Sequence, residues 1–212
     1  MSASDNPWAA RRIEYATAGL AESDLAADPV AMFRRWYDDA ADLPEPNAVV
    51  VATVSADGWP SARTVLLKGM DADGARFFTN QASRKGTDLA AQPRCALLFP
   101  WHPLERQVRV EGVAEPLSRA EVAAYFHSRP RGSQLGAWAS HQSQPTTTDE
   151  LERAFAAAEA AYPVEVPVPD DWGGYLVRPV RWEFWQGRRN RLHDRLCYVR
   201  EGTSWRIERL AP

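Results

Sequence analysis

The sequence predicts a mainly β fold with inserted helices (α+β), built as an antiparallel barrel with helical decoration rather than as a doubly wound parallel sheet. Runs rich in β-branched and aromatic residues follow one another and are joined by tight turns, which is typical of a β-meander. Segments with helix-capping residues interrupt these runs without alternating regularly with them. We therefore expect the helices to decorate one antiparallel sheet.

The predicted strands occur in both halves of the chain. A valine-rich run from Ala48 to Ser55 precedes an Ala-Asp-Gly turn, and a second turn at Asp71 to Gly74 leads into Arg76 to Thr79. The other predicted strands are Pro60 to Met70, Cys95 to Pro100, Gln107 to Glu111, Gly174 to Val180, Trp182 to Gln186, Leu196 to Arg200 and Trp205 to Leu210.

Helices are expected where a capping residue opens a segment. Asp28 followed by Pro29 predicts a helix through Tyr37, and Ser118 with Glu121 forms a capping box that opens a helix towards His127. The remaining predicted helices run from Trp8 to Leu20, from Ser83 to about Gln92, and from Thr148 to a point before Pro163.

Length and composition favour one large domain over residues 1–212, with a helical amino-terminal segment over residues 1–42. The chain has 212 residues, 45% of them hydrophobic, and a formal net charge of -3. Because this charge is modest and the basic residues are scattered among carboxylates, we expect neither a nucleic-acid binder nor a membrane-surface protein.

The cysteines and apolar runs indicate where the protein works. Cys95 and Cys197 lie far apart and form no CxxC, which fits a reducing compartment and makes the cytoplasm the expected location. No apolar run approaches the roughly 20 residues that span a bilayer, and the start MSASDNPW lacks a signal segment. Neither membrane insertion nor secretion is expected.

Motifs of several catalytic classes are missing from the sequence. The four histidines show no metal-ligand spacing with carboxylates or cysteines, so no metal site is expected. The chain has no GxGxxG or Walker sequence, and Ser133 lacks the glycines of a nucleophile elbow. Redox chemistry by a bound cofactor therefore fits better than a side-chain nucleophile.

Ser83, Arg84 and Lys85 stand at a predicted helix start. Free backbone N–H groups, the helix dipole and two adjacent cations favour an anion there. An ordinary capped surface helix explains the same residues equally well.

Tyr125, Arg129 and Ser133 lie around a predicted helix end at Pro130. Two hydroxyls and a guanidinium near one loop suit a phosphate monoester. Alternatively, Arg129 complements the helix dipole and Tyr125 belongs to the core.

Other residues suit a heteroaromatic ring. Gln107, Gln142 and Trp185 offer amide hydrogen bonds and an indole face, although each alone more often serves packing. In the run RTVLLK, a regular strand places Arg63 and Lys68 on opposite faces, so the two cations would serve different neighbours. The alternative for Lys68 is an exposed strand end.

His193 lies between Arg191 and Arg195. If this stretch is extended, all three side chains lie on one face. They form either part of a site or a basic strand edge that protects the sheet from pairing with other chains.

These strings together resemble the pyridoxine (pyridoxamine) 5′-phosphate oxidase family, whose members use FMN to make pyridoxal phosphate. The resemblance runs from RRIEY at Arg11 through RTVLLK, FFTN, SRK, LFPWHPLERQV, YFHSRPRGSQLGAWAS, WGGY and FWQGRRNRLHDR to the terminal RLAP. It implies an FMN-binding split β-barrel that forms a homodimer, with FMN held at the subunit interface.

The resemblance also implies roles for individual residues. Arg191 and His193 are expected over the substrate ring as the catalytic pair, and Arg12 and Tyr15 in a lid. The expected contacts of the substrate phosphate are Lys68, Tyr125, Arg129 and Ser133. The expected FMN contacts are Arg63, Thr64, Val65, Leu66, Leu67, Lys68, Phe78, Thr79, Arg84, Lys85, Gln107, Gln142, Ser143, Trp185 and Arg195.

Two departures from the family pattern stand out. Phe78 occupies a position where the family often has tyrosine, and RRIEY differs from the commoner RREY, which affects the register of the lid. Neither departure touches the residues expected around the substrate phosphate.

The implied reaction is oxidation at C4′ of pyridoxine or pyridoxamine 5′-phosphate, with dioxygen as acceptor and hydrogen peroxide as product. Two alternatives stay open: a related flavin oxidase acting on a phenazine-type substrate, and a non-catalytic flavin or pyridoxal-phosphate carrier. The residues expected around the phosphate argue against the first, and Arg191 with His193 argues against the second.

Overall fold

The computed structural model describes residues 14–15 and 19–212. Most of the helix predicted from Trp8 to Leu20, including the predicted lid residue Arg12, lies outside the described residues. The chain divides into two compact units. The first comprises Met1–Pro46, Phe99–Arg109 and Arg181–Pro212, and the second comprises Asn47–Leu98 and Val110–Val180. The expectation of one domain remains a prediction.

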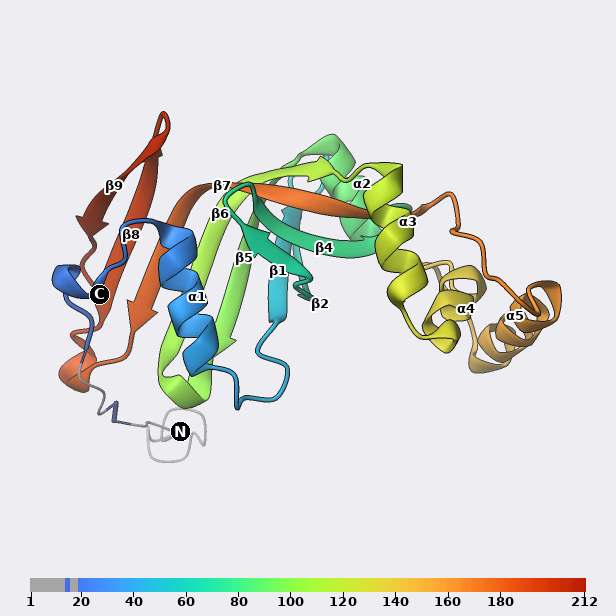
Figure 1. Ribbon diagram of the computed structural model, residues 1–212, viewed down its shortest axis with the longest axis horizontal. Helices are drawn as coiled ribbons and strands as arrows, with labels where there is room; N and C mark the ends of the chain where they lie inside the picture. The colour runs from blue at the N-terminus through green and yellow to red at the C-terminus, as the bar shows by residue number, and fades with distance from the viewer. Residues whose placement is uncertain (1–13, 16–18) are drawn as a thin grey trace, which may run out of the picture. The chain divides into compact units, whose positions relative to one another are not determined.

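The described residues form a sheet of nine strands, which confirms the predicted mainly β, antiparallel fold class (Figure 1). The strands pair in the order β2-β1-β5-β6-β7-β4-β3, and β8 pairs with both β7 and β9. Their bounds are β1 Ala48–Val54, β2 Pro60–Leu66, β3 Gly69–Asp71, β4 Gly74–Asn80, β5 Arg94–Trp101, β6 Arg106–Pro116, β7 Trp172–Gln186, β8 Asp194–Glu201 and β9 Ser204–Arg209.

In the second unit, β1 and β2 form a hairpin in which Ala48 pairs with Leu66 and Val54 with Pro60. Alternate residues of β1 are buried, as expected for a strand with one face on the core. On the other side of the unit, β4 pairs with the first half of β7, so that Asn80 stands opposite Trp172. These pairings fix the positions of β2 and β4, which carry much of the candidate site.

The second unit also contains α2 (Arg84–Ala91), α3 (Arg119–Ser128), α4 (Arg131–Ala139) and α5 (Thr148–Ala161). The capping box predicted at the start of α3 is confirmed, because Ser118 accepts from the Glu121 N–H while Glu121 accepts from the Ser118 N–H. A second capping box opens α5. The core of this helical region consists of Val122, Phe126, Leu135, Ala158, Val166 and Trp172.

In the first unit, α1 (Pro29–Asp39) begins at the predicted cap, where Asp28 accepts hydrogen bonds from two backbone N–H groups. Its buried face packs on aromatic residues: the Phe33 and Phe99 rings lie 4.9 Å apart, and the Trp36 and Phe184 rings lie 5.3 Å apart. None of the helices in the described part of the chain is both long and apolar enough to cross a bilayer.

Three predicted elements differ from the structure. The two strands predicted from Gly174 to Val180 and from Trp182 to Gln186 form the single strand β7, because no turn residue separates them. The strand predicted over Pro60 to Met70 breaks, because the chain changes its pairing partner: the Leu67 N–H donates to Asn47, and the Lys68 N–H donates to Arg76 on β4.

Helix α4 was not predicted. Two glycines, Gly132 and Gly136, lie within it and lower its helix propensity, and Pro130 occupies its N-cap position without a side-chain cap. Burial of Leu135 in the helical core stabilises α4 despite its low helix propensity.

Candidate functional site

A cavity of about 690 Å³ lies within the second unit, a size that suits a small-molecule ligand. Its lining residues lie on or directly beside β2, β4, the start of β7, and the helices α2, α3 and α4, and in the segment after α4. Within the described part of the chain, the lining includes five cationic side chains and no carboxylate, so the cavity is suited to anions. The five cations are Arg63, Lys68, Arg84, Lys85 and Arg129.

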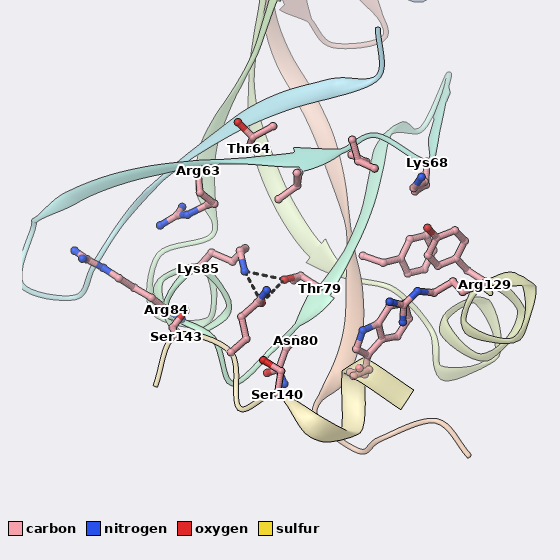
Figure 2. Close-up of a pocket in the computed structure, with 18 of the residues that line it drawn as sticks. Arg63, Thr64, Lys68, Thr79, Asn80, Arg84, Lys85, Arg129, Ser140 and Ser143 are labelled. Atoms are coloured by element: carbon pink, nitrogen blue, oxygen red, sulfur yellow. Dashed lines mark hydrogen bonds between the residues drawn. The ribbon is translucent and has the colours of Figure 1, made fainter. Parts of the chain in front are cut away.

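The cations form two separate groups. Figure 2 shows Arg63, Arg84 and Lys85 on one side of the cavity and Lys68 with Arg129 on the other, with Thr79 between them. We call these the first and the second cationic group. Two groups at different places can each bind one anionic moiety.

Lys85 is buried, with 6% of its surface exposed. Its ammonium donates to the Thr79 hydroxyl at 2.8 Å, the Ser83 hydroxyl at 3.0 Å and the Gln142 side-chain oxygen at 2.8 Å. All three acceptors are neutral. Burial, and next the nearby charge of Arg63, lowers the pKa of Lys85 to about 8. An anion in the cavity would supply the missing counter-charge.

Arg63 is held in place by β1 and α2. Its guanidinium donates to the Thr53 hydroxyl at 2.6 Å and to the Val51 carbonyl at 3.2 Å, and it lies 3.8 Å from the Asp88 carboxylate. Asp88 in turn accepts from the Thr53 hydroxyl at 2.6 Å. Burial lowers the pKa of Arg63, with Asp88 acting in the opposite direction. The guanidinium is therefore fixed before any ligand binds.

The start of α2 completes the first cationic group. Ser83 occupies the predicted N-cap position, but its hydroxyl donates to the Asn80 carbonyl and accepts from Lys85, so it does not cap the helix. The Arg84 N–H instead donates to the Ser143 hydroxyl at 3.2 Å. The positive end of the helix dipole thus lies beside three cations.

A stack of three aromatic rings, from Phe78, Tyr125 and Trp172, borders the second cationic group. The Phe78 and Tyr125 ring centroids lie 3.9 Å apart, and those of Phe78 and Trp172 lie 5.8 Å apart. The Lys68 ammonium lies 6.0 Å from the centre of the Tyr125 ring. Tyr125 is half-buried and lines the cavity, so it is more than a core residue.

Arg129 is the C-cap residue of α3. Its guanidinium carbon lies 4.7 Å from the centre of the Trp172 ring and 5.6 Å from that of Phe126. Its Nη1 is buried, and no hydrogen-bond partner exists for it among the described residues. Burial lowers the pKa of Arg129, and Tyr125 opposes this shift. The residue therefore retains charge and a donor that no acceptor in the described part of the chain uses.

Most of the predicted contact residues of the second unit line this cavity. They are Arg63, Thr64, Val65, Leu66, Lys68, Phe78, Thr79, Arg84, Lys85, Tyr125, Arg129, Gln142 and Ser143. Leu67 does not line it and is buried, and Ser133 does not line it and is exposed on α4.

Sequence reasoning missed four polar or aromatic lining residues: Ser61, Asn80, Ser140 and Trp172. Asn80 and Trp172 lie in the strings FFTN and WGGY, whose likeness to a family was noted. With 6% of its surface exposed, Trp172 is buried as well as lining the cavity. No signal in the sequence singles out Ser140.

The remaining predicted residues lie in the first unit. Gln107 is half-buried on β6 and does not line the cavity. Tyr15, Trp185 and His193 form a cluster: the Trp185 and His193 rings lie 4.7 Å apart, and Tyr15 lies 5.8 Å from Trp185 and 5.6 Å from His193. The Arg188 N–H donates to Nδ1 of His193 at 3.1 Å.

The expectation that Arg191, His193 and Arg195 share one face of an extended chain is wrong. Arg191 ends the 3-10 helix η4 (Arg189–Arg191) with a φ of 60°, and β8 begins only at Asp194. Side chains alternate between two faces only in a strand, and Arg191 lies outside β8, so it does not share a strand face with Arg195.

Arg195 is engaged within its own unit. It donates to both carboxylate oxygens of the buried Glu183, at 2.8 and 3.1 Å, and to the Ala211 carbonyl at 3.0 Å. The hydrogen bonds to Glu183 raise the pKa of Arg195. Arg109 also donates to Glu183, at 2.6 Å, so two cations hold one buried carboxylate.

Comparison with known proteins gives a consistent result. Residues 39–162 match the family model described as pyridoxamine 5′-phosphate oxidase, and residues 172–212 match the pyridoxine 5′-phosphate oxidase C-terminal dimerisation region. The chain is 63% identical over 207 residues to a pyridoxine/pyridoxamine 5′-phosphate oxidase from Nocardioides sp., covering 96% of this chain and 97% of the relative.

Two solved structures share the fold. PhzG from Burkholderia lata, in complex with tetrahydrophenazine-1-carboxylic acid, has a TM-score of 0.84 and 32% identity, covering 90% of this chain and 95% of that one. A pyridoxamine 5′-phosphate oxidase-related, FMN-binding protein from Nostoc punctiforme has a TM-score of 0.74 and 20% identity, covering 89% of this chain and 100% of that one. These likenesses identify the antiparallel sheet as that of the split β-barrel proteins.

Proposed function

This chain belongs to the pyridoxine/pyridoxamine 5′-phosphate oxidase family, and from that premise we propose that it oxidises pyridoxine or pyridoxamine 5′-phosphate to pyridoxal 5′-phosphate, with FMN as cofactor. One observation supports this proposal most. One cavity carries two separate cationic groups and, among the described residues, no carboxylate in its lining, which suits a phosphorylated cofactor beside a phosphorylated substrate.

The first cationic group fits the phosphate of FMN. Lys85 is a buried ammonium with three neutral acceptors, and Arg63 and Arg84 add charge beside the start of α2. A helix start with adjacent cations is a common phosphate site. Thr79 and Gln142, which both contact Lys85, provide polar atoms for the edge of the flavin ring.

The second cationic group fits the phosphate of the substrate. Lys68 and Arg129 provide charge, and Tyr125 provides a hydroxyl and a ring face. Neither Lys68 nor Arg129 forms an ion pair within the described part of the chain, so both charges are available to a dianion. We retain Ser133 as a proposed fourth contact, although it would have to reach the phosphate from its exposed position on α4.

Bound FMN would supply the acceptor for a hydride from C4′ of the substrate, and dioxygen would then take up the electrons to give hydrogen peroxide. His193 and Arg191 are the proposed residues over the substrate ring. His193 accepts the Arg188 N–H at Nδ1, which places the imidazole proton on Nε2. In this tautomer Nε2 is a hydrogen-bond donor, which suits a residue that orients the substrate rather than one that removes its proton.

We further propose that the protein is a homodimer whose sites draw on both copies. Residues 172–212 match a dimerisation region, and Trp185, Arg191, His193 and Arg195 all belong to it. None of these four lines the cavity of the second unit. A second copy with FMN at the subunit interface would provide them.

The alternative substrate class is a phenazine, because PhzG shares the fold at 32% identity and was solved with a tetrahydrophenazine carboxylic acid. A phenazine of this kind carries a carboxylate but no phosphate ester. Lys68, Tyr125 and Arg129 provide two cations and a hydroxyl at one place, which matches a phosphate better than a single carboxylate.

The absorption spectrum of the purified protein tests the proposal. We expect a flavin spectrum that bleaches anaerobically when pyridoxine 5′-phosphate is added, and peroxide production when air is admitted. Unphosphorylated pyridoxine should act poorly at the same concentration. A protein that retains FMN but neither bleaches nor makes peroxide would be a carrier, and one that turns over only a phenazine would support the alternative.

A further inference from the structure

We propose that Trp172 is a positioning residue for the substrate phosphate, and that it acts through Arg129. The inference rests on the proposed function, because it concerns the second cationic group. The relevant geometry is the Arg129 guanidinium over the Trp172 ring, at 4.7 Å from guanidinium carbon to ring centre.

The way in which Arg129 is held is unusual within this site. Arg63 is fixed by hydroxyl and carbonyl acceptors, and Lys85 by two hydroxyls and an amide oxygen. Arg129 has instead two ring faces, those of Trp172 and Phe126, and its buried Nη1 has no acceptor among the described residues. A cation over a ring face is stabilised through its charge and uses up no acceptor. Its donors therefore stay available to a ligand.

Trp172 is itself rigidly placed. It is the first residue of β7 and pairs with Asn80 of β4, and its carbonyl accepts from Arg119 at 2.9 Å. Its ring lies nearly parallel to the rings of Phe78 and Tyr125, with interplanar angles of 8° and 11°. A fixed ring face gives Arg129 a fixed position.

The ring stack also links the two cations of this group. Tyr125 and Phe78 lie 3.9 Å apart, and the Lys68 ammonium lies 6.0 Å from the Tyr125 ring centre. Lys68 therefore contacts one member of the stack, and Arg129 contacts another. We infer that the stack sets the separation of the two charges that bind the phosphate.

A purely structural role for Trp172 has to be distinguished from this one, because Trp172 also packs on Phe126 at 5.1 Å in the helical core. The two roles differ in what they change. A structural loss lowers stability, FMN binding and turnover together. Loss of positioning raises the KM for a phosphorylated substrate while kcat and FMN affinity stay nearly constant, because the FMN phosphate is proposed to bind the first cationic group.

The test uses the full-length holoenzyme with Trp172→Leu, which removes the ring, and Trp172→Phe, which keeps a smaller ring face. For Trp172→Leu we expect the KM for pyridoxine 5′-phosphate and the inhibition constant of inorganic phosphate to rise by the same factor, about three- to thirtyfold, the range that cation–π interactions supply. For Trp172→Phe the rise should be smaller, and for both variants kcat should change less than twofold, roughly.

The matched control is Trp205→Phe. The Arg200 guanidinium lies 4.4 Å from the Trp205 ring centre, a separation close to that of Arg129 and Trp172, but Trp205 does not line the cavity. This control should leave all constants unchanged. In an Arg129→Ala background, Trp172→Phe and Trp172→Leu should have no further effect on KM, because the residue through which Trp172 acts is gone.

The inference fails if Trp172→Leu leaves both the KM for pyridoxine 5′-phosphate and the inhibition constant of inorganic phosphate unchanged. If the leucine variant does not fold, Trp172→Phe decides the same question. The inference also fails if the effect of either variant persists in the Arg129→Ala background. A third contrary result is a variant in which FMN affinity and kcat both fall while the KM rises, because that pattern indicates a structural role. A wild-type protein that makes no peroxide from pyridoxine 5′-phosphate would overturn the proposed function instead. Thermal protection by inorganic phosphate would then still report whether Trp172 affects anion binding.

Discussion

The Lys85 ammonium donates a hydrogen bond to the Gln142 side-chain oxygen at 2.8 Å, which joins the start of α2 to the segment that follows α4. The other acceptors of Lys85 are the hydroxyls of Thr79 and Ser83, and no carboxylate of residues 14–15 and 19–212 lines the cavity. Burial lowers the pKa of Lys85 to about 8. This value makes its charge depend on pH within an experimentally accessible range.

We predict that FMN affinity falls as the pH rises above about 8. The protonated ammonium is the form that binds a phosphate, and it predominates below its pKa. Above that pKa, binding has to restore one proton, so the affinity should fall by up to about tenfold per pH unit. The FMN phosphate is already dianionic there, since phosphate monoesters lose their second proton near pH 6, approximately. Fluorescence quenching of FMN by the apoprotein measures the effect.

Lys85→Arg provides the control for this prediction, because a guanidinium stays charged throughout the range. Its affinity is expected to be lower than that of the wild type at pH values near neutrality but independent of pH. If the wild type shows a flat profile as well, Lys85 does not contribute its charge to FMN binding.

A second prediction concerns Arg129, whose buried Nη1 has no acceptor among the described residues. Arg129→Ala should raise the KM for pyridoxine 5′-phosphate by about ten- to a hundredfold, the effect of losing a hydrogen bond to a charged group. FMN affinity should stay the same. Ser133→Ala, on the exposed face of α4, should have a smaller effect. Steady-state peroxide production measures both, and an unchanged KM in Arg129→Ala would remove this residue from the phosphate site.

The elements of the fold that could be predicted are those set by a few neighbouring residues. The helix starts at Asp28 and at Ser118 were predicted because capping is a property of a few neighbouring residues. The break after Leu66 was not predicted, because it arises where the chain leaves β1 and pairs with β4. Tertiary pairing of this kind leaves no local signature when the residues on both sides favour strands.

The same distinction applies to the site. Arg84 and Lys85 were expected at an anion site from their position at a helix start, and both line the cavity. The role of Ser83 was expected from capping statistics, yet its hydroxyl contacts Lys85 and Asn80 instead. A shared face for Arg191, His193 and Arg195 required an extended chain, and this condition is not met because the backbone is left-handed at Asn190 and Arg191. Such backbone reversals without glycine are not visible in residue patterns.

A third prediction tests the backbone beside the first cationic group. Gly86 lies in α2, and a Cβ there would overlap the backbone carbonyl of Gln81. Gly86→Ala should lower the free energy of unfolding by about 1–3 kcal/mol, the usual cost of overpacking, although alanine favours helix. Gly132→Ala in α4 is the matched control, because nothing lies within 4 Å of its Cβ position.

Denaturant unfolding of the apoprotein measures both glycine variants. The control should be neutral or more stable by up to about 1 kcal/mol. If Gly86→Ala is as stable as the control, α2 does not approach Gln81 as closely as described.

A fourth prediction concerns Arg191, which is exposed in the turn before His193. Arg191→Ala should slow anaerobic flavin reduction by roughly tenfold or more, because a positively charged group over the substrate ring is lost, while FMN affinity changes little. Stopped-flow absorbance gives the first quantity and flavin fluorescence the second. Arg189→Ala, in the same turn, is the control. Equal loss of reduction rate and FMN affinity would refute this division of roles.

The last prediction tests whether one site draws on two copies of the chain. Lys85 lines the cavity, whereas Arg191 belongs to the dimerisation region and does not. If the cavity of one copy uses Arg191 of the other, a mixed dimer of Lys85→Met and Arg191→Ala chains contains one intact site. Each homodimer contains none. Co-expression with two affinity tags, followed by tandem purification, should therefore recover about half of the wild-type activity per dimer, since sites act independently.

If each copy instead uses its own Arg191, both sites of the mixed dimer carry a defect, and its activity should not exceed that of the two homodimers. A mixed dimer of wild-type and Lys85→Met chains is the control, because it retains one intact site under either arrangement. FMN content adds an independent readout: both mixed dimers should bind about one FMN, since only one cavity in each keeps Lys85. Full FMN occupancy without activity would show that Lys85→Met does not prevent FMN binding in its own cavity.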